Sequence, residues 1–504
     1  MLNDLKKKVA AQTAANGGKP RNIKVMDTLF RDAHQCLWAT RMRTEDMLPI
    51  ARTLDEVGFD NIEAMGLVQY DAAVRFLNQN PFTRLRLLRE RITNTRIRGL
   101  LRGNLLGGFA PVHDDITDLF ATCQVANGAR EHAQFDSLHD IDVMVPGAKI
   151  TKSLGAKYIV AVLYNHAPGY DDAYYEAVTR EACEKLKPDG IQLVDAGGTM
   201  PLERVRTLVP AIRGAMPDHV TLELNTHCMT GLGPLVALEA AIYGVDTIYT
   251  APELMAQGNA APGSQMIVRN LRELGFEVDI DLDALTKVED YLRDLAIREG
   301  KPIGRPNEFN EGQYVSQMAG GALSNVESQL KEAGIHHRLP EVIEEVGRVR
   351  MELGSPIMAT PYPAIIAAQA VMNVVQGERY KVVPAEVKKY ICGYYGNLRI
   401  PVDPNVVDLV MENGPRSIPE TPEPLEPIVP KLRARYPRAS DDELVLRYIY
   451  GDERYEGLNP TLVRDEMSAD NPIATLVDRL SKRPNKSWIH VSGANFKLSL
   501  GPNS

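Results

Sequence analysis

Short apolar segments alternate with longer amphipathic segments eight times between about residues 22 and 302 of this 504-residue chain. The apolar segments have the length of β-strands, and the segments between them repeat hydrophobic residues at helical spacing. The predicted strands are Ile23–Leu29, Asn61–Met65, Arg98–Leu101, Ala133–Phe135, Ala156–Leu163, Gly190–Val194, Thr221–Leu224 and Thr247–Tyr249. Eight such units favour an α/β fold of the closed (β/α)8 barrel type, although periodicity alone leaves a doubly wound sheet open.

The pattern changes after about residue 302. Helical spacing then dominates, for example in Leu339–Leu353 and Ala364–Val375, and a Pro- and Glu-rich stretch at 418–427 is typical of an extended linker. We therefore expect an N-terminal helix and linker (1–21), a TIM barrel (22–302), a mainly helical domain (303–460) and a C-terminal tail (461–504).

Composition excludes several classes of protein. A net charge of -9 argues against general nucleic-acid binding. The five cysteines form no CxxC pair, so neither a disulfide framework nor a zinc finger is indicated, and a reducing cytoplasm fits best. The first residues lack the apolar core of a signal peptide, and no segment has the uninterrupted apolar length of a membrane span. These features predict a cytoplasmic protein with no nucleic-acid or membrane partner.

A polar sequence, Phe30-Arg31-Asp32-Ala33-His34-Gln35, follows the first predicted strand. Barrel enzymes do their chemistry at the carboxyl ends of their strands. A cation, a carboxylate and an amide would meet there. Taken alone, the Arg31–Asp32 pair is better explained as a structural ion pair, so its flanking sequence decides its interpretation.

The continuation from Cys36 to Met47 resembles the opening of the biotin-dependent carboxyltransferases. Members of that family include the 5S subunit of transcarboxylase, the carboxyltransferase domain of pyruvate carboxylase and the alpha subunit of oxaloacetate decarboxylase. The resemblance runs from about residue 25 to about 458 and implies a barrel followed by a helical domain. It is carried also by the segments 65–71, 84–90, 100–109, 135–140, 311–314, 320–325, 359–361, 369–380 and 393–404.

The resemblance implies a divalent metal inside the barrel mouth. Family members bind it through the Asp of the Arg-Asp pair, a carbamylated Lys and two His. Asp32 matches the Asp and His227 the second His, whereas Asn225 replaces the first His and Val194 replaces the Lys. The implied ligands are Asp32, His227 and Asn225, with Zn, Co or Mn as the ion, and Cys228 is a further thiolate donor if its backbone turns inward. The alternative is that no metal binds.

The other matched positions imply an active site for a keto acid. Arg31 and Gln35 match the pair that contacts the enolate oxygen, and Arg102 matches the arginine that holds the substrate carboxylate. Thr360 matches the threonine that moves a proton between the substrate methyl group and biotin. Tyr362-Pro363-Ala364 replaces polar residues that seat biotin in the family. The alternative for Arg31 is an ion pair with a barrel carboxylate.

The resemblance also implies partners. No Met is followed by Lys, so the chain has no Met-Lys-Met biotin-acceptor motif. Biotin would therefore reside on a separate carrier protein, served by a biotin carboxylase, and the substrate would be of the pyruvate or oxaloacetate type. The family implies a homodimer. Two alternatives stay open: a biotin-independent lyase, decarboxylase or aldol-type enzyme, and a non-catalytic scaffold subunit of a carboxylase complex.

Overall fold

A computed structural model describes residues 2–103, 105–107, 111–318, 326–327, 330–332, 334–459, 489–493 and 496–500. The segment 320–325, one of those that carry the family resemblance, lies outside the described residues. The chain forms two compact units that divide after residue 460. In the second unit, β9 (Ile489–Gly493) and β10 (Phe496–Leu500) form an antiparallel hairpin.

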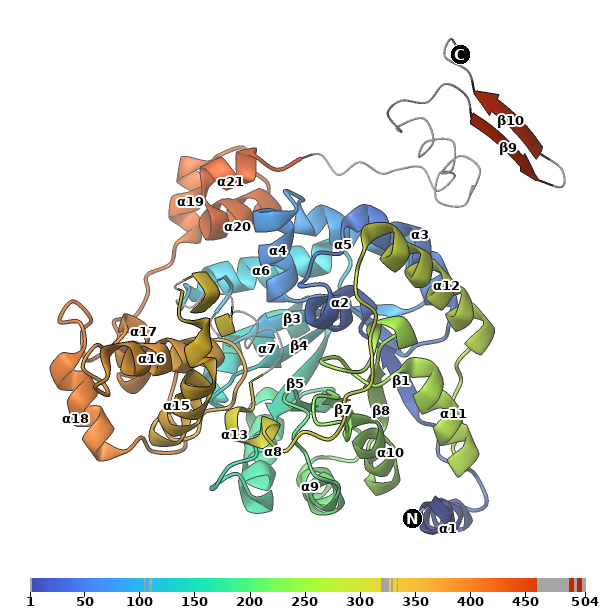
Figure 1. The fold of residues 1–504 in the computed structure, drawn as a ribbon, viewed down its shortest axis with the longest axis horizontal. Helices are drawn as coiled ribbons and strands as arrows, with labels where there is room; N and C mark the ends of the chain where they lie inside the picture. The colour runs from blue at the N-terminus through green and yellow to red at the C-terminus, as the bar shows by residue number, and fades with distance from the viewer. Residues whose placement is uncertain are drawn as a thin grey trace. The chain divides into compact units, whose positions relative to one another are not determined.

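The centre of the first unit is a closed barrel of eight parallel strands in sequence order (Figure 1). The strands are β1 (Lys24–Asp27), β2 (Asn61–Met65), β3 (Arg96–Arg102), β4 (Glu131–Phe135), β5 (Lys157–Leu163), β6 (Gly190–Asp195), β7 (Thr221–Thr226) and β8 (Thr247–Thr250). The barrel closes because β1 pairs with both β2 and β8. This confirms the predicted (β/α)8 barrel, since a doubly wound sheet would leave two edges unpaired.

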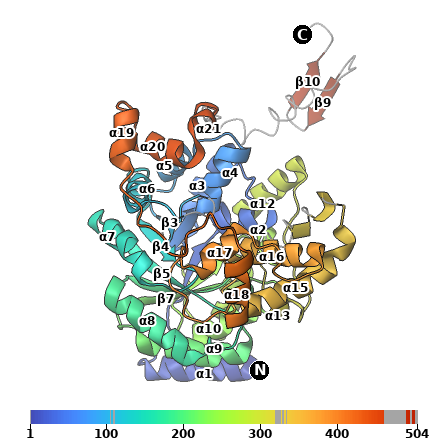
Figure 2. The ribbon, with the colours of Figure 1, turned by 90° about the vertical axis from the view of Figure 1, so that its left-hand side faces the viewer.

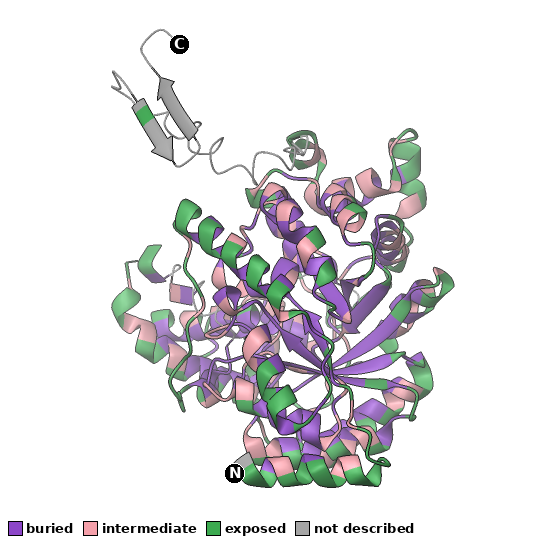
Figure 3. Ribbon diagram, turned by 90° about the vertical axis from the view of Figure 1, so that its right-hand side faces the viewer, coloured by how far each residue is buried: buried purple, intermediate pink, exposed green. Residues whose placement is uncertain are grey.

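Helices surround the strands, and Figure 3 shows buried strands inside helices that have one exposed face. They are α3 (Thr44–Glu56), α4 (Leu67–Phe76), α5 (Pro81–Arg91), α6 (Asp114–Ala126), α7 (Val145–Ser153), α8 (Asp172–Leu186), α9 (Leu202–Ala215), α10 (Gly233–Tyr243), α11 (Ser264–Leu274) and α12 (Leu282–Glu299). Helix α12 shows how sequence sets such an element. Asp281 caps its first turn by accepting the N–H groups of Asp283 and Ala284, and Gly300 ends it with a φ of 62°. An N-terminal helix, α1 (Leu2–Ala15), packs on α10 and α11.

In the part of the chain that the structure describes, the helices after residue 312 fall into two groups. The first contains α13 (Gln313–Ser316), α15 (Leu339–Glu352), α16 (Tyr362–Gln376), α17 (Ala385–Ile391) and α18 (Pro404–Asn413). Helices α15 to α18 share a second apolar cluster, which also includes Leu105 and Leu138 from loops of the barrel. The second contains α19 (Val429–Arg435), α20 (Asp441–Tyr450) and α21 (Asp452–Glu456). Helix α20 packs on α6 and α21 on α4, as both views show (Figures 1 and 2). The chain therefore returns to the barrel wall after leaving it. No helix in the described part of the chain has both the length and the apolar character that a bilayer crossing requires.

Four buried polar side chains form a network inside the barrel. Arg98 on β3 lies 2.6 Å from a carboxylate oxygen of Glu223 on β7 and also pairs with Glu131 on β4. The hydroxyl of Tyr249 on β8 donates to Glu223 at 2.9 Å. All four residues are buried, so each charge is balanced inside the protein rather than by water. This network joins strands from opposite sides of the barrel.

The first strand is shorter than its sequence predicts. The predicted strand runs to Leu29, but β1 ends at Asp27. The carboxylate of Asp27 accepts the N–H of Leu29 at 2.9 Å, and the carbonyl of Thr28 accepts the N–H of Ala33 at 3.1 Å. These bonds turn the backbone into a π-helical segment, Leu29–Ala33, that continues as α2 (His34–Leu37). The Arg31–Asp32 pair therefore lies on a helical turn, not on a strand.

Candidate active site

The helical turn after β1 sets the spacing of the candidate residues. Residues four apart on a helix lie on the same face, so Asp32 faces the same way as Cys36, and Arg31 the same way as Gln35. Gln69, in the first turn of α4, holds the turn in place. Its Nε2 donates to the carbonyl of Arg31 at 2.7 Å and to Oε1 of Gln35 at 3.2 Å. Sequence reasoning did not select Gln69, because its role depends on a contact between separate βα units.

Asp32 is the centre of the cluster. Its Oδ2 lies 2.7 Å from Nε2 of His227, which follows β7, and its Oδ1 contacts the guanidinium of Arg31. Burial opposes ionisation of Asp32, but Arg31 and His227 together hold the pKa of this carboxyl below its usual range. Burial also opposes the imidazolium of His227, yet Asp32 raises the pKa of His227 above its ordinary value. The pair therefore places an ionised carboxylate against a histidine in a buried setting.

Arg31 also contacts a second carboxylate. Its Nε lies 2.9 Å from Oε2 of Glu63, which is fully buried on β2. The ion pair with a barrel carboxylate, which the sequence left as an alternative, is therefore present. It does not exclude a role toward substrate, because Arg31 keeps 15% of its side-chain surface exposed. Glu63 orients the guanidinium, and Asp32 lies beside it.

Three potential metal-ligand atoms lie together in the described part of the chain. They belong to Asp32, Cys36 and His227, and all lie within 4.8 Å of one another. Cys228, the thiol that the sequence suggested as a donor, lies outside this group and packs instead against Gly233. The sequence did not indicate Cys36 as a ligand, because its side chain lies on the same face as Asp32 only when residues 29–37 are helical. A carboxylate, an imidazole and a thiol form a donor set that suits a divalent transition metal.

Asn225 and Val194 occupy the other two positions of the implied metal site. They pair directly across strands β7 and β6. The side-chain oxygen of Asn225 is buried and has no hydrogen-bond partner among the described residues. A buried amide oxygen without a donor is costly, and a cation would satisfy it. Val194 offers no donor atom, so the position of the family's lysine contributes only apolar surface.

Arg102 ends β3 at the same mouth of the barrel. It is 6% exposed, and burial lowers the pKa of its guanidinium to about 10, although Asp71 acts in the opposite direction. A buried guanidinium is well suited to a bidentate contact with a carboxylate.

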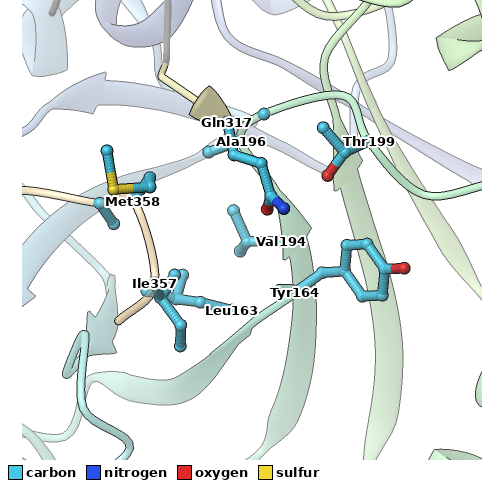
Figure 4. Close-up of a pocket in the computed structure, with 10 residues that line it drawn as sticks. Leu163, Tyr164, Val194, Ala196, Thr199, Gln317, Ile357 and Met358 are labelled. Atoms are coloured by element: carbon cyan, nitrogen blue, oxygen red, sulfur yellow. The ribbon is translucent and has the colours of Figure 1, made fainter. Parts of the chain in front are cut away.

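Thr360 lies where the helical region meets the barrel. Its carbonyl accepts a hydrogen bond at 3.2 Å from the hydroxyl of Ser137, which follows β4. The preceding residues, 357–359, line a pocket together with Val194 and Tyr164 at the ends of β6 and β5. Figure 4 shows the labelled side chains around this opening. The pocket therefore joins the position of the missing lysine to the segment that carries Thr360.

Known proteins resemble this chain over most of its length. The conserved carboxylase domain family matches residues 314–456. The chain is 33% identical to a pyruvate carboxylase subunit of Methanocaldococcus jannaschii, over 95% of this chain and 84% of that protein. It is 32% identical to the methylmalonyl-CoA carboxyltransferase 5S subunit of Propionibacterium freudenreichii, over 81% of each chain.

Two further known proteins resemble this chain, one in sequence and one in fold. The chain is 30% identical to the 2-oxoglutarate carboxylase large subunit of Hydrogenobacter thermophilus, over 79% of this chain and 61% of that protein. Its fold matches the carboxyl transferase domain of Rhizobium etli pyruvate carboxylase, solved with pyruvate and biocytin. That match has a TM-score of 0.79 at 22% identity and covers 93% of this chain and 83% of that structure. At this identity the structural likeness concerns the fold alone.

Proposed function

We propose that this chain, which belongs to the biotin-dependent carboxyltransferase family, moves a carboxyl group between a 2-oxo acid and biotin carried on a separate protein. It is an enzyme of the carboxyltransferase and carboxylase type. One observation supports the site most strongly. Arg31, Asp32 and His227 meet in a buried cluster at the carboxyl end of the barrel, where Asp32 and His227 are 2.7 Å apart.

The reaction requires one proton transfer and one carbon transfer. In the carboxylating direction, the C–N bond of carboxybiotin breaks and releases CO2, and the biotin nitrogen takes a proton from the methyl or methylene carbon of the 2-oxo acid. The resulting enolate then forms a C–C bond to CO2. We assign the proton transfer to the hydroxyl of Thr360 and stabilisation of the enolate oxygen to Arg31 and Gln35. Arg102 binds the substrate carboxylate.

Asp32, His227 and Asn225 would hold a divalent metal. Such an ion would act as a Lewis acid toward the carbonyl oxygen of the substrate. Two features of the chain fit this assignment: the ionised state of Asp32 and the unpartnered amide oxygen of Asn225 among the described residues. Arg31 keeps Asp32 ionised and so available as a ligand.

The substrate class is a 2-oxo acid. Relatives of this chain carry the names of enzymes for pyruvate and for 2-oxoglutarate, and both acids offer the same carboxylate and carbonyl to Arg102 and Arg31. We further propose a biotin carrier protein and a biotin carboxylase as partners, and a homodimer as the assembly. A biotin-independent lyase and a non-catalytic scaffold are not favoured by these relatives.

The reverse reaction tests the proposal with purified full-length protein and free biotin. The protein is incubated with oxaloacetate, or with the product of carboxylating 2-oxoglutarate, and release of the parent 2-oxo acid is measured. We expect release that increases with biotin and saturates, and that Asp32→Ala abolishes. Release at the same rate without biotin would instead indicate a biotin-independent decarboxylase. Failure with both acids, in the presence of biotin and added Zn, Co or Mn, would contradict the proposal.

A further inference from the structure

We infer that Cys36 is a thiolate ligand of the divalent metal at the barrel mouth, together with Asp32 and His227. The inference rests on the proposed function, because it concerns the same site, and it changes the ligand set that the family resemblance implies. Val194 removes the lysine ligand and Asn225 replaces a histidine by a weaker donor. Cys36 supplies a strong donor from the helical turn after β1.

The donor atoms of Asp32, Cys36 and His227 lie close to one another. Nε2 of His227 and Oδ2 of Asp32 are 2.7 Å apart, and Sγ of Cys36 lies 4.0 Å from Oδ1 of Asp32. Usual zinc bond lengths in a tetrahedron place nitrogen and oxygen ligands about 3.4 Å apart, and sulfur and oxygen ligands about 3.6 Å apart. One separation is shorter and the other longer than these values, and they involve the two different oxygens of Asp32. One ligand atom from each of the three residues lies within 4.8 Å of the other two, which is close enough for the side chains to converge on one ion.

The backbone that carries Cys36 is held in place. Cys36 follows Asp32 by four residues on the helical turn, so the two side chains leave the same face. Gln69 fixes that turn through the carbonyl of Arg31. The site thus draws two ligands from one helical turn after β1 and a third from the residue after β7.

A separate observation also indicates a cation. The amide oxygen of Asn225 is buried without a hydrogen-bond partner among the described residues, and Asn225 lies two residues before His227. Residues two apart along extended backbone leave the same face, which places Asn225 on the side of His227. With Asn225 the donor set is a carboxylate, an imidazole, a thiolate and an amide oxygen. A thiolate in such a set favours Zn or Co over Mn or Mg.

Cobalt substitution tests the thiolate directly, without reference to activity. Full-length protein is stripped of metal with a chelator, titrated with Co²⁺ and followed by absorption and elemental analysis. We expect about one bound equivalent and a thiolate-to-cobalt charge-transfer band in the near ultraviolet. Cys36→Ser should lose the band and bind Co²⁺ at least about 10-fold more weakly. Cys183→Ser removes a partly buried thiol on α8 outside the ligand cluster and should leave both unchanged.

A second readout covers the event that Cys36→Ser does not fold. In the wild-type protein, bound Zn²⁺ should protect Cys36 from alkylation, as measured by mass spectrometry of its peptide, whereas alkylation of Cys183 should not depend on the metal. Binding of Co²⁺ without the charge-transfer band, or alkylation of Cys36 at equal rates with and without Zn²⁺, would overturn the thiolate ligand. Failure to bind Co²⁺ or Zn²⁺ would overturn the metal site. The biotin-dependent assay on the same preparation would show separately whether carboxyl transfer survives.

Discussion

His227 and Asp32 lie 195 positions apart in the sequence, yet their side chains meet at 2.7 Å in the barrel mouth. Closure of the barrel through β8 places the carboxyl ends of β1 and β7 close together, with β8 between them. The contact is buried, and it orients both groups toward the same space. The chemistry proposed for this enzyme depends on that contact.

Replacement of Arg102 should weaken binding of the 2-oxo acid. Loss of a buried guanidinium that pairs with a carboxylate costs about 2–5 kcal/mol, so Arg102→Ala should raise KM for the 2-oxo acid at least about 30-fold. Arg102→Lys should restore only part of the affinity, because an ammonium group cannot make the bidentate contact. Steady-state kinetics with varied 2-oxo acid would measure this, and Arg86→Ala, at an exposed arginine on α5, is the control. An unchanged KM in Arg102→Ala would remove the carboxylate-binding role.

Loss of the Thr360 hydroxyl should slow turnover without weakening substrate binding. Proton transfer by a positioned side chain contributes about 100-fold or more, so Thr360→Ala should lower kcat by at least that factor. Thr360→Ser keeps the hydroxyl and should retain most of the activity. The assay is biotin-dependent release of the 2-oxo acid, with kcat and KM determined for each variant. Equal kcat values for Thr360→Ala and the wild type would contradict a role in proton transfer.

Asp27 should make the folded protein less stable as pH rises. Burial raises the pKa of Asp27 to about 8, whereas an unfolded aspartate has a pKa of about 4. The folded state therefore holds this proton more tightly, and the stabilisation is full below about pH 4 and is lost as pH rises through 8. Asp27→Asn should remove a slope of up to about 1.4 kcal/mol per pH unit between these values.

Urea unfolding at several pH values would measure the effect of Asp27. Asn270→Ala, at an exposed residue of α11 that carries no titratable group, provides the control and should leave the pH dependence unchanged. If Asp27→Asn and the wild type show the same dependence of unfolding free energy on pH, the carboxyl of Asp27 does not titrate as proposed.

Arg98 should be among the most sensitive positions for stability. Arg98→Ala leaves the buried carboxylate of Glu223 without its ion-pair partner and leaves Glu131 with Arg96 alone, at 3.7 Å. Breaking a buried ion pair in this way costs about 3–5 kcal/mol. Arg180→Ala, on α8, removes an exposed ion pair with Glu176 and should cost no more than about 1 kcal/mol. Thermal and urea unfolding of the two variants would compare them. Similar losses would show that the buried network is not what stabilises the barrel.

The sequence was sufficient to predict the barrel architecture, because buried strands and helices repeat hydrophobic residues at spacings that can be recognised within a short segment. Strand β2 has the predicted bounds, Asn61–Met65, and the other seven differ only at their ends. The error at β1 bears directly on the site, because the apolar run continues past Asp27 but the backbone turns helical. Hydrophobicity does not distinguish a strand from the first turn of a helix when both are buried.

The candidate site, too, could be predicted from the sequence only in part. The family resemblance marked Asp32 and His227 as donors, and the identity of Val194 excluded a ligand at the lysine position, since a side chain either carries a ligating atom or does not. Which thiol joins them was decided by tertiary structure. Cys228 is next to His227 in sequence but packs away from the cluster, whereas Cys36 is brought to Asp32 by a helical turn that Gln69 holds from another βα unit. Sequence determines the donor atoms, and long-range contacts determine which of them share one space.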